Sequence, residues 1–322
     1  MKATARAYAI QGLIKYHGLR NEKLRLPYHD SISVCTKALP TITTVEFSRD
    51  SPRDEVLIDG KTPLRRERDR VLVVVDKLRR LSGSRSLKVR VESSNPRVKG
   101  KGLGFSASGF AALGQAAAKA LDLEIETKSL SEVVRLGAGS ASRSLTGGFS
   151  IWYANKNGRS YSEELADAKT ITLKTIIAPI ESEVKTDRAH ADVVWSPFFR
   201  PRLNYLRRIL PKMKRALSQK DVESIARLAE EDTLNLHAVT MTGKQGIVLF
   251  SPLSIEIIRE VRKLRQEEEI PAWFSLDTGP SVFINTTKDA APTVRRSISK
   301  IAKTVLVSDP GGPAEIVNKH LF

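Results

Sequence analysis

A loop rich in glycine and serine runs directly into an alanine-rich helix in the stretch Gly102-Leu103-Gly104-Phe105-Ser106-Ala107-Ser108-Gly109-Phe110-Ala111-Ala112-Leu113. Glycines let the backbone approach a ligand closely, and the first N–H groups of a helix have no partner within it. Because that helix end carries partial positive charge, the segment predicts a phosphate site, with Ser106 and Ser108 adding hydroxyls for phosphate or Mg²⁺. No Gly-Lys-Ser/Thr follows, so this is not a Walker A loop. Taken alone, a flexible loop before an ordinary helix remains the alternative.

Further segments along the chain extend this pattern. They are Lys15-Tyr16-His17-Gly18, Leu24-Arg25-Leu26-Pro27, Asp30-Ser31-Ile32-Ser33-Val34, Gly137-Ala138-Gly139-Ser140-Ala141-Ser142-Arg143-Ser144-Leu145-Thr146-Gly147-Gly148 and Ser275-Leu276-Asp277-Thr278-Gly279-Pro280. In this order they resemble the mevalonate-pathway decarboxylases of the GHMP kinase superfamily, from about Ala5 to Gly312. The last two segments are the specific ones, whereas the glycine loop alone would indicate only the superfamily.

The resemblance implies an α+β chain with the two-domain GHMP kinase fold. Its N-terminal domain, expected over residues 1–180, would be ribosomal-protein-S5-like and bind ATP and the substrate. Its C-terminal domain, expected over residues 181–322, would be ferredoxin-like and carry Asp277, and the site would lie between the two.

Apolar periodicity predicts the elements of the first half. The predicted strands are Ala5–Gly12, Ser31–Thr36, Thr43–Phe47, Glu55–Ile58, Leu87–Glu92, Phe149–Ala154 and Thr170–Ile177. The predicted helices are Arg66–Leu81, Gly109–Leu121 and Ser129–Leu136. Thr43–Phe47 and Glu55–Ile58 are expected to pair with each other. Ser129 is expected to be an N-cap, with Glu132 completing a capping box.

A crossover is predicted at Pro179–Pro197, between the two domains. Amphipathic helices are expected after it at Leu203–Ala216, Val222–Asn235 and Ile255–Glu268, and strands at Trp273–Leu276, Val282–Asn285 and Thr304–Val307. Pro211 should kink or split the first helix, because proline lacks the N–H that a helix interior needs. Helices separated from strands in this way also favour an α+β domain.

The composition bounds the class of protein. At 322 residues, with 41% hydrophobic and 28% charged residues, the chain can bury a large core and divide into two domains. No apolar run approaches the length of a membrane span, and no signal peptide is recognisable, so a cytoplasmic protein without a membrane partner is expected. Cys35 is the only cysteine, which excludes an internal disulfide and a multi-cysteine zinc site.

The formal net charge of +17 raises the question of a polyanionic partner. The basic residues are spread among Asp and Glu, and aromatics are only 6% of the chain, so no stacking surface for bases is recognisable. The composition therefore favours a basic surface with a small polyanionic substrate, and no nucleic-acid partner. A nucleic-acid-binding protein is the alternative from another class, and a homodimer is the expected assembly.

Three residues are predicted to be catalytic. Asp277 follows a strand-like run, where a carboxylate can accept a proton, although an Asp that forms a turn before Gly-Pro is the alternative. Arg143 stands among small residues, where a guanidinium can hold a carboxylate with two hydrogen bonds, although a solvated Arg is the alternative. The resemblance places Asp277 on the C3 hydroxyl of the substrate and Arg143 on its carboxylate. The Lys15 ammonium would keep Asp277 ionised.

Four residues are predicted to bind the substrate, all from the resemblance. Tyr16 and Arg70 match residues that contact the substrate phosphate, Ser140 matches a substrate-contacting serine, and Arg188 is expected on the phosphate. For Arg70, a solvated Arg is the alternative.

The resemblance also implies ATP as co-substrate, with Mg²⁺. Ser106 is expected at the γ-phosphate and as the metal contact, and Ser93, Ser94 and Asn95 match the segment that borders the nucleotide. The full set predicted to bind ATP is Ser93, Ser94, Asn95, Gly102, Leu103, Gly104, Ser106, Ala107 and Ser108. The histidines show no metal-ligand spacing, so none is expected to be a ligand.

Two departures from the family pattern bear on the substrate. Leu19 and Ala138 stand where diphosphomevalonate decarboxylases have a Lys and a Ser on the outer phosphate. The variants around His17 and His29 resemble the phosphomevalonate decarboxylases of archaeal-type pathways. The predicted reaction is therefore ATP-dependent decarboxylation of (R)-5-phosphomevalonate to isopentenyl phosphate, ADP, phosphate and CO₂. The 5-diphosphate as substrate is the nearest alternative, and mevalonate 3-kinase is disfavoured because that relative lacks the matching Asp.

Overall fold

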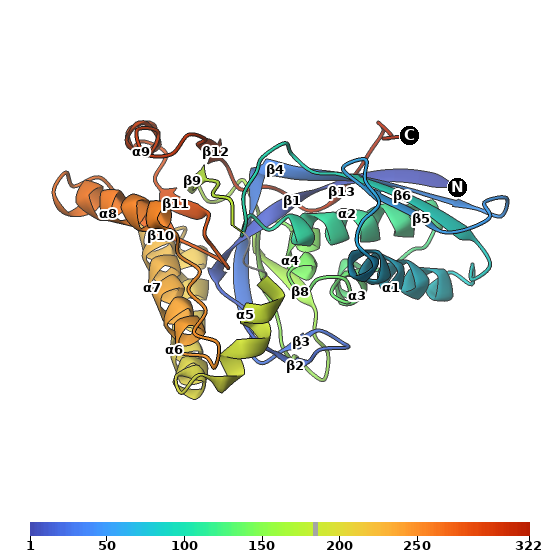
Figure 1. Cartoon of the computed structure of the whole chain (residues 1–322), viewed down its shortest axis with the longest axis horizontal. Coiled ribbons are helices and arrows are strands. Elements are labelled where there is room, and N and C mark those ends of the chain that lie inside the picture. The colour runs from blue at the N-terminus through green and yellow to red at the C-terminus, as the bar shows by residue number, and fades with distance from the viewer. Residues whose placement is uncertain (183–185) are drawn as a thin grey trace.

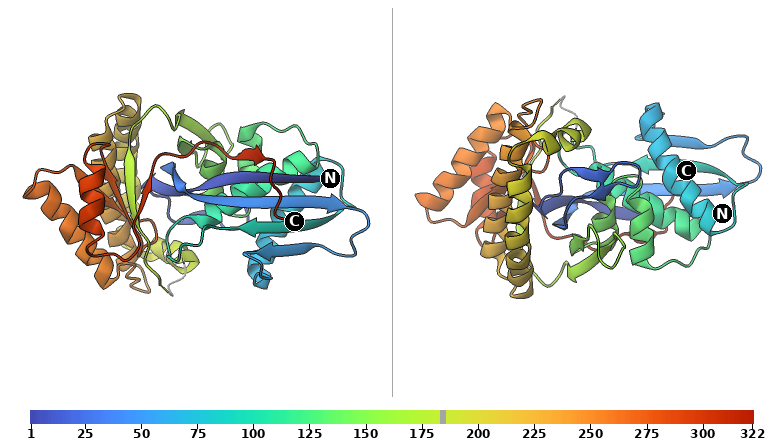
Figure 2. Two further views of the ribbon diagram at one scale, coloured as in Figure 1. Left: turned by 90° about the horizontal axis from the view of Figure 1, so that it is seen from above. Right: turned by 90° about the horizontal axis from the view of Figure 1, so that it is seen from below.

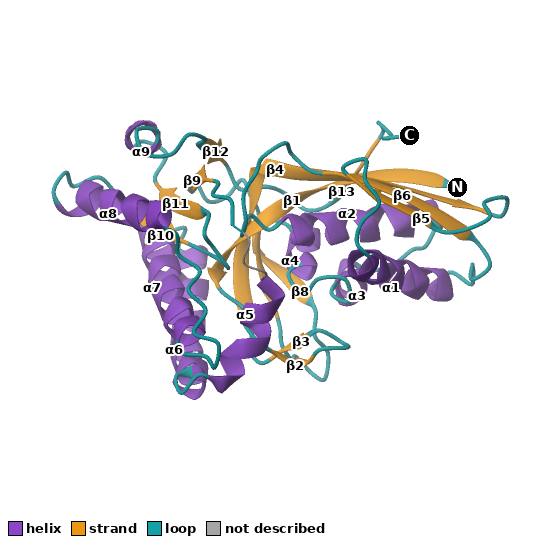
Figure 3. Ribbon diagram, viewed as in Figure 1, coloured by secondary structure: helices purple, strands orange, loops and turns teal. Residues whose placement is uncertain are grey.

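The computed structural model describes residues 1–182 and 186–322, and it describes residues 186–188 by their backbone only. Two β-sheets lie side by side, each covered by helices (Figures 1 and 3). The larger sheet contains β1 (Lys2–Ile14), β4 (Ser31–Ser48), β5 (Glu55–Ile58), β6 (Lys88–Ser94), β7 (Phe149–Trp152), β8 (Ser162–Ala166) and β13 (Glu315–Val317). The smaller sheet contains β9 (Lys174–Ala178), β10 (Ala272–Ser275), β11 (Val282–Thr286) and β12 (Leu306–Ser308). A short hairpin pairs β2 (Leu19–Asn21) with β3 (Leu26–Pro27).

The helices of the first domain cover one face of the larger sheet (Figure 2). They are α1 (Arg65–Leu81), α2 (Phe105–Ala120), α3 (Thr127–Val134) and α4 (Ala141–Thr146). Alternate residues of β1, Ala3, Ala5 and Ala7, are buried in the same core as the alanines of α2. Small side chains on both surfaces let the helix lie close to the strand. This packing determines where the loop before α2 meets β1.

The remaining helices belong to the second half of the chain. They are α5 (Thr186–Asp192), the 3₁₀ helix η1 (Val193–Trp195), α6 (Phe199–Ser218), α7 (Val222–Met241), α8 (Pro252–Gln266) and α9 (Ala291–Ile298). Apolar residues of α8 and α9 bury one face of the smaller sheet. Residues of α6 and α7 pack against the ends of β1 and β4, among them Leu206 and Met213 against Leu13 and Ile32. The two halves therefore share an apolar core where β1 ends.

The smaller sheet has the predicted ferredoxin-like topology. Its strands are antiparallel in the order β10-β11-β9-β12, so the first strand in the chain lies between the third and fourth. Helices connect the first strand to the second and the third to the fourth, which is the split βαβ arrangement. Two strands belong to the sheet on the other side of the predicted division at residue 180. The strand β9 precedes residue 180 but pairs within the smaller sheet, and β13 follows it but pairs with β1 in the larger sheet. The division into 1–180 and 181–322 stays a prediction.

Several local predictions were wrong. Glu55–Ile58 does not pair with Thr43–Phe47, because β6 lies between β4 and β5 and pairs in parallel with β5. The connection through α1 is long enough for such a parallel crossover. The two predicted strands Ser31–Thr36 and Thr43–Phe47 are one strand, β4.

Two predicted helix features also differ from the structure. The third helix begins at Thr127, and Ser129 lies inside it with its hydroxyl accepting a hydrogen bond from Arg159, which also binds Glu132. The side chains expected to form a capping box thus bind an arginine instead. Pro211 lies on the exposed side of the continuous helix α6, where water can hydrogen-bond the carbonyl that has lost its partner.

Candidate active site

A cavity of about 310 Å³ lies where the glycine loop, the end of β1, α4 and the loop after β10 meet. Its lining includes most of the predicted site: Lys15, Tyr16, Arg70, Gly102, Leu103, Gly104, Ser106, Ala107, Ser140, Arg143 and Asp277. These residues come from five separate parts of the sequence. The tertiary structure therefore brings the predicted catalytic residues, three of the four predicted substrate residues and the glycine loop to a single site.

The glycine loop is wedged between β1 and the Gly279 turn. Gly102 and Gly104 have φ of +77° and +82°, a left-handed conformation that favours glycine. A Cβ on Gly104 would lie 2.7 Å from the carbonyl oxygen of Ile10, and one on Gly102 would lie 2.8 Å from that of Gly279. Helix α2 begins directly after the loop, at Phe105, and its first three residues line the cavity. The first N–H groups of the helix, which have no partner within it, therefore lie at the cavity wall. This is the geometry predicted for binding phosphate.

We expect Gly104→Ala to raise the KM for ATP and to destabilise the fold by at least 1–2 kcal/mol, roughly the cost of a strained φ combined with a backbone clash. Gly109→Ala is a matched control, because Gly109 lies inside α2 and a Cβ there meets no atom within 4 Å apart from its chain neighbours and the backbone of its own helix. That control should be neutral or slightly stabilising. Thermal melts and ATP titrations of both variants are the measurement, and equal effects at the two positions would contradict the role assigned to the loop.

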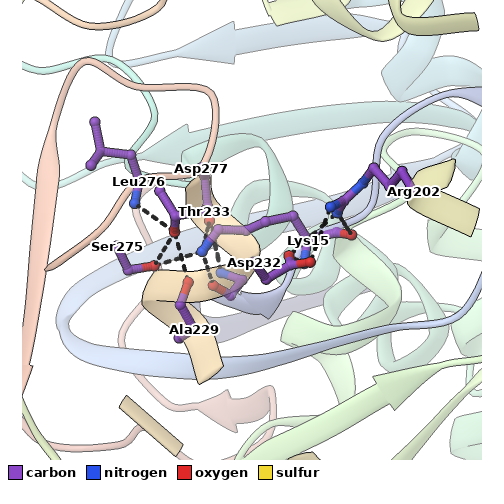
Figure 4. Close-up of polar contacts among 9 residues, drawn as sticks. Lys15, Arg202, Ala229, Asp232, Thr233, Ser275, Leu276 and Asp277 are labelled. Carbon is purple, nitrogen blue, oxygen red and sulfur yellow. Dashed lines mark hydrogen bonds and ion pairs between the residues drawn. The ribbon is translucent and has the colours of Figure 1, made fainter. Parts of the chain in front are cut away.

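Lys15 and Asp277 form a partly buried ion pair in the site (Figure 4). The Lys15 Nζ lies 3.4 Å from Asp277 Oδ1 and donates a 2.5 Å hydrogen bond to the Ser275 hydroxyl and another to the carbonyl of Gly12. The Gly12 N–H in turn donates to both carboxylate oxygens of Asp277, at 3.0 and 3.1 Å. The lysine side chain is 2% exposed and the aspartate 23%, so the carboxylate is the member of the pair that reaches the cavity.

Burial changes the proton affinity of both members. Burial raises the pKa of Asp277, and the nearby Lys15 ammonium and the Gly12 N–H oppose that rise. Burial lowers the pKa of Lys15, against the opposite effect of Asp277 and Asp232. A base whose pKa is raised and an acid whose pKa is lowered are closer in proton affinity than they would be in water. Such a pair is suited to accepting a proton from a hydroxyl.

Arg143 lies on α4 with its side chain in the cavity wall. The residue is only 2% exposed, which excludes the solvated Arg considered from sequence. Its Nε and Nη1 find no hydrogen-bond partner within the described part of the chain. Burial lowers the pKa of the guanidinium to about 10, and Asp277 opposes this. A buried cation with unused donors is costly unless an anion joins it, so the position favours an anionic ligand.

Part of the cavity lining is basic and aromatic. Tyr16 stacks on His190 with ring centroids 4.6 Å apart, and the Arg143 guanidinium carbon lies 5.9 Å from the Tyr16 ring centroid. Arg70 donates to the carbonyl of Gly137 at 2.8 Å, beside Ser140, the residue that precedes α4. Arg70 is therefore held in the cavity lining, where the sequence prediction needs it to bind a phosphate. These residues form a surface that suits a phosphate.

Some predicted site residues lie elsewhere. Ser108 is fully buried, its hydroxyl bonded to Thr41 and to the carbonyl of Phe105, and Ser93 bonds Thr43. Asn95 binds Asp59 through its backbone N–H and its side chain, and Ser94 is exposed at the end of β6. None of these four residues lines the cavity. Arg188 is predicted to bind the substrate phosphate, and its side chain lies outside the part of the chain that the structure describes.

Sequence reasoning missed three groups at the site. Arg25 lines the cavity and donates to the carbonyl of Leu136 at 3.2 Å. Its place in the quoted Leu24–Pro27 segment was the available signal. His190 lines the cavity as well, from α5. Asp232 and Arg202 bind the backbone of Lys15, and they gave no signal because they lie 217 and 187 residues from it in the sequence.

The fold and this site define the class of the chain, an enzyme with the GHMP kinase fold. A family model described as diphosphomevalonate decarboxylase-like N-terminal domain matches residues 7–163, and one described as mevalonate 5-diphosphate decarboxylase C-terminal domain matches residues 186–309. The chain belongs to the diphosphomevalonate decarboxylase family, and the resemblance drawn from its motifs is confirmed.

Individual relatives cover almost the whole chain. The phosphomevalonate decarboxylase of Haloferax volcanii is 41% identical over 99% of this chain and 98% of its own length. The human diphosphomevalonate decarboxylase is 30% identical over 86% of this chain and 74% of its own. The structure of mevalonate diphosphate decarboxylase from Staphylococcus aureus matches with a TM-score of 0.91 at 28% identity, covering 98% of both chains. That of MDDEF in complex with MVAPP, AMPPCP and magnesium matches with a TM-score of 0.90 at 28% identity, covering 99% of both.

Proposed function

We propose that this chain decarboxylates (R)-5-phosphomevalonate in an ATP-dependent reaction that yields isopentenyl phosphate, ADP, phosphate and CO₂. The observation that carries the proposal is that the Lys15–Asp277 pair, Arg143 and the glycine loop line one cavity. A carboxylate that can accept a hydroxyl proton, a buried guanidinium that needs an anion and a phosphate-binding helix end are the three groups that this reaction requires. The 41% identity to a phosphomevalonate decarboxylase supports the same conclusion.

The residues present fit ATP and Mg²⁺. The glycine loop leaves no room for a Cβ and directs the N-terminus of α2 at the cavity, where phosphates would lie. Among the described residues, no group of three or more His, Cys, Asp or Glu is arranged to hold a metal by itself. Mg²⁺ commonly binds through substrate phosphates and water with one or two protein groups, and Ser106 would be such a group here. When bound, the ion neutralises charge on the phosphates.

The arrangement accounts for each step of the reaction. Asp277 orients the C3 hydroxyl and accepts its proton while the oxygen forms a bond to the γ-phosphorus of ATP and the bond to ADP breaks. The C3–O bond then breaks and phosphate leaves. The C1–C2 bond supplies the electrons for the new C2–C3 double bond, and CO₂ leaves from C1. Arg143 holds the carboxylate in position until that step, and Lys15 balances the charge of Asp277.

We expect the 5-monophosphate to be preferred over the 5-diphosphate. Ala138 lines the cavity without a hydroxyl, and Leu19 lies in β2, outside the cavity lining. Arg25 and Arg70 remain beside Ala138 for one phosphate. A lost hydrogen bond to a charged group costs about 1.5–3 kcal/mol, or roughly a tenfold to hundredfold loss in kcat/KM for the diphosphate.

Product assays with mevalonate, its 5-phosphate and its 5-diphosphate measure this preference. A Leu19→Lys/Ala138→Ser double variant should raise kcat/KM for the diphosphate relative to the monophosphate. A wild-type preference for the diphosphate would instead establish the alternative substrate. Phosphorylation of mevalonate without CO₂ release would establish a 3-kinase.

We propose in addition a cytoplasmic homodimer that binds no nucleic acid. The spread of basic residues and the low aromatic content support the last point. Among the described residues, the helices are all too short or too polar to cross a bilayer. Light scattering on the purified chain would measure the assembly state, and filter binding at physiological salt would measure any affinity for nucleic acid.

A further inference from the structure

Two buried side chains grip the backbone of Lys15 from helices α6 and α7 (Figure 4). The Lys15 N–H donates to Asp232 Oδ2 at 2.6 Å, and Arg202 Nη2 donates to the Lys15 carbonyl at 3.2 Å. Lys15 follows directly after the last residue of β1. The backbone N–H and C=O of Lys15 no longer have partners in the sheet, and these two side chains supply their hydrogen bonds instead.

Asp232 and Arg202 also pair with each other. Arg202 Nη1 lies 3.1 Å from Asp232 Oδ1 and donates a 2.6 Å hydrogen bond to Asn235 Oδ1. The side chains of the ion pair are 1% and 0% exposed. A fully buried ion pair adds little stability compared with apolar residues of the same volume, because both charges lose their hydration. Stability alone therefore does not account for this pair beside the site.

Helix α7 contacts the Asp277 side of the site as well. Thr233, the next residue after Asp232, accepts a 3.4 Å hydrogen bond from the N–H of Leu276, and its hydroxyl lies 3.4 Å from that of Ser275. One turn of α7 thus touches both the backbone of Lys15 and the segment that ends at Asp277. The helix therefore contacts both segments of the catalytic pair, which come from different domains.

We propose that Asp232 and Arg202 are positioning residues, which clamp the Lys15 peptide so that its ammonium is held against Asp277. The clamp acts through the backbone, and neither of its two residues lines the cavity. This inference rests on the proposed decarboxylation, because Lys15 and Asp277 are assigned their roles there.

The clamp also has an electrostatic consequence. The charged and titratable groups that face Lys15 are Asp277, Asp232, Arg202 and His237. Burial and the nearby Lys15 keep the pKa of His237 at about 3, so this ring is neutral at working pH. Asp232 raises the pKa of the Lys15 ammonium and Arg202 lowers it. Removing the charge of Asp232 should therefore lower the pKa of Lys15 and move the basic limb of the kcat–pH profile to lower pH.

The test compares variants with the wild-type chain, whose own decarboxylation is measured first. Asp232→Asn should lower kcat by on the order of tenfold to hundredfold, the scale of a misplaced catalytic group, while the KM for ATP stays within about twofold. The basic limb should move to lower pH. Asp54→Asn is the matched control, because Asp54 pairs with the mostly buried Arg79 away from the site, and it should lower the melting temperature without changing kcat or its pH profile.

A double variant separates positioning from folding. Asp232→Asn/Arg202→Met removes both charges at similar volume and leaves no unpaired buried charge, so it should melt at a higher temperature than Asp232→Asn, yet kcat should stay low because the Lys15 carbonyl has lost its donor. If Asp232→Asn does not fold, Asn235→Ala, which keeps both charges, should give a smaller fall in kcat in the same direction. Wild-type kcat and pH profile in the folded variants would overturn the inference, whereas an inactive wild-type chain would overturn the proposed function.

Discussion

Replacing Asp277 by asparagine should lower kcat by on the order of 10²–10⁴, the usual contribution of a general base. The variant keeps the size of the side chain and one oxygen for the Gly12 N–H, but it loses the charge and the basicity. The KM for ATP should change little, because the phosphates are assigned to the glycine loop on another part of the cavity wall. Single-turnover measurements of ADP and CO₂ release are the assay.

The pH profile gives a second measure of the same role. Burial raises the pKa of Asp277 above that of a free aspartate, so wild-type activity should be lost as the pH falls through this raised value and the base is protonated. The acid limb should vanish in Asp277→Asn. Asp289→Asn, at an exposed position, is the control and should leave the profile unchanged. A folded Asp277→Asn chain with undiminished turnover would remove Asp277 from the mechanism, and a chain that unfolds would favour the turn-forming role.

Replacing Arg143 by lysine should lower kcat/KM by roughly 10- to 100-fold, although the charge is kept, because a lost charged hydrogen bond costs about 1.5–3 kcal/mol. The guanidinium of Arg143 has two buried nitrogens, Nε and Nη1, without a partner within the described residues. These nitrogens lie on different sides of the planar group, and each can donate together with Nη2 to hold a carboxylate at two points. A lysine ammonium is a single point with a shorter reach, so it cannot reproduce that geometry.

Steady-state kinetics with the monophosphate and a thermal melt measure the effect of Arg143→Lys. Arg207→Lys, on the exposed side of α6, is the matched control and should retain full kcat/KM. Near-normal kcat/KM in the Arg143 variant would show that the residue does not hold the substrate carboxylate. A fall in melting temperature with unchanged kinetics would assign Arg143 to the structure of α4.

Local features of the sequence predicted the elements that depend on local chemistry. The helix from Arg65 and the alanine helix α2 follow from apolar spacing, and the glycines before α2 mark a backbone conformation that other residues adopt poorly. The ferredoxin-like order of the second sheet came from the resemblance, since periodicity does not reveal strand order. The misplaced cap at Ser129 has the opposite cause, because a distant Arg159 binds the side chains that would have capped the helix.

By itself the sequence determined the glycine loop, the identity of Lys15, Arg143 and Asp277 as candidate catalytic residues, and the family, because motif residues and their order are local properties. Only the tertiary structure decided which predicted residues lie together. It placed the Ser108 side chain in the core, hydrogen-bonded to Thr41, and it placed Arg25 in the cavity lining. It alone revealed the grip of Asp232 and Arg202 on Lys15, across more than 180 residues. The physical reason is that burial and hydrogen-bond partners depend on contacts between distant segments, and no local pattern encodes them.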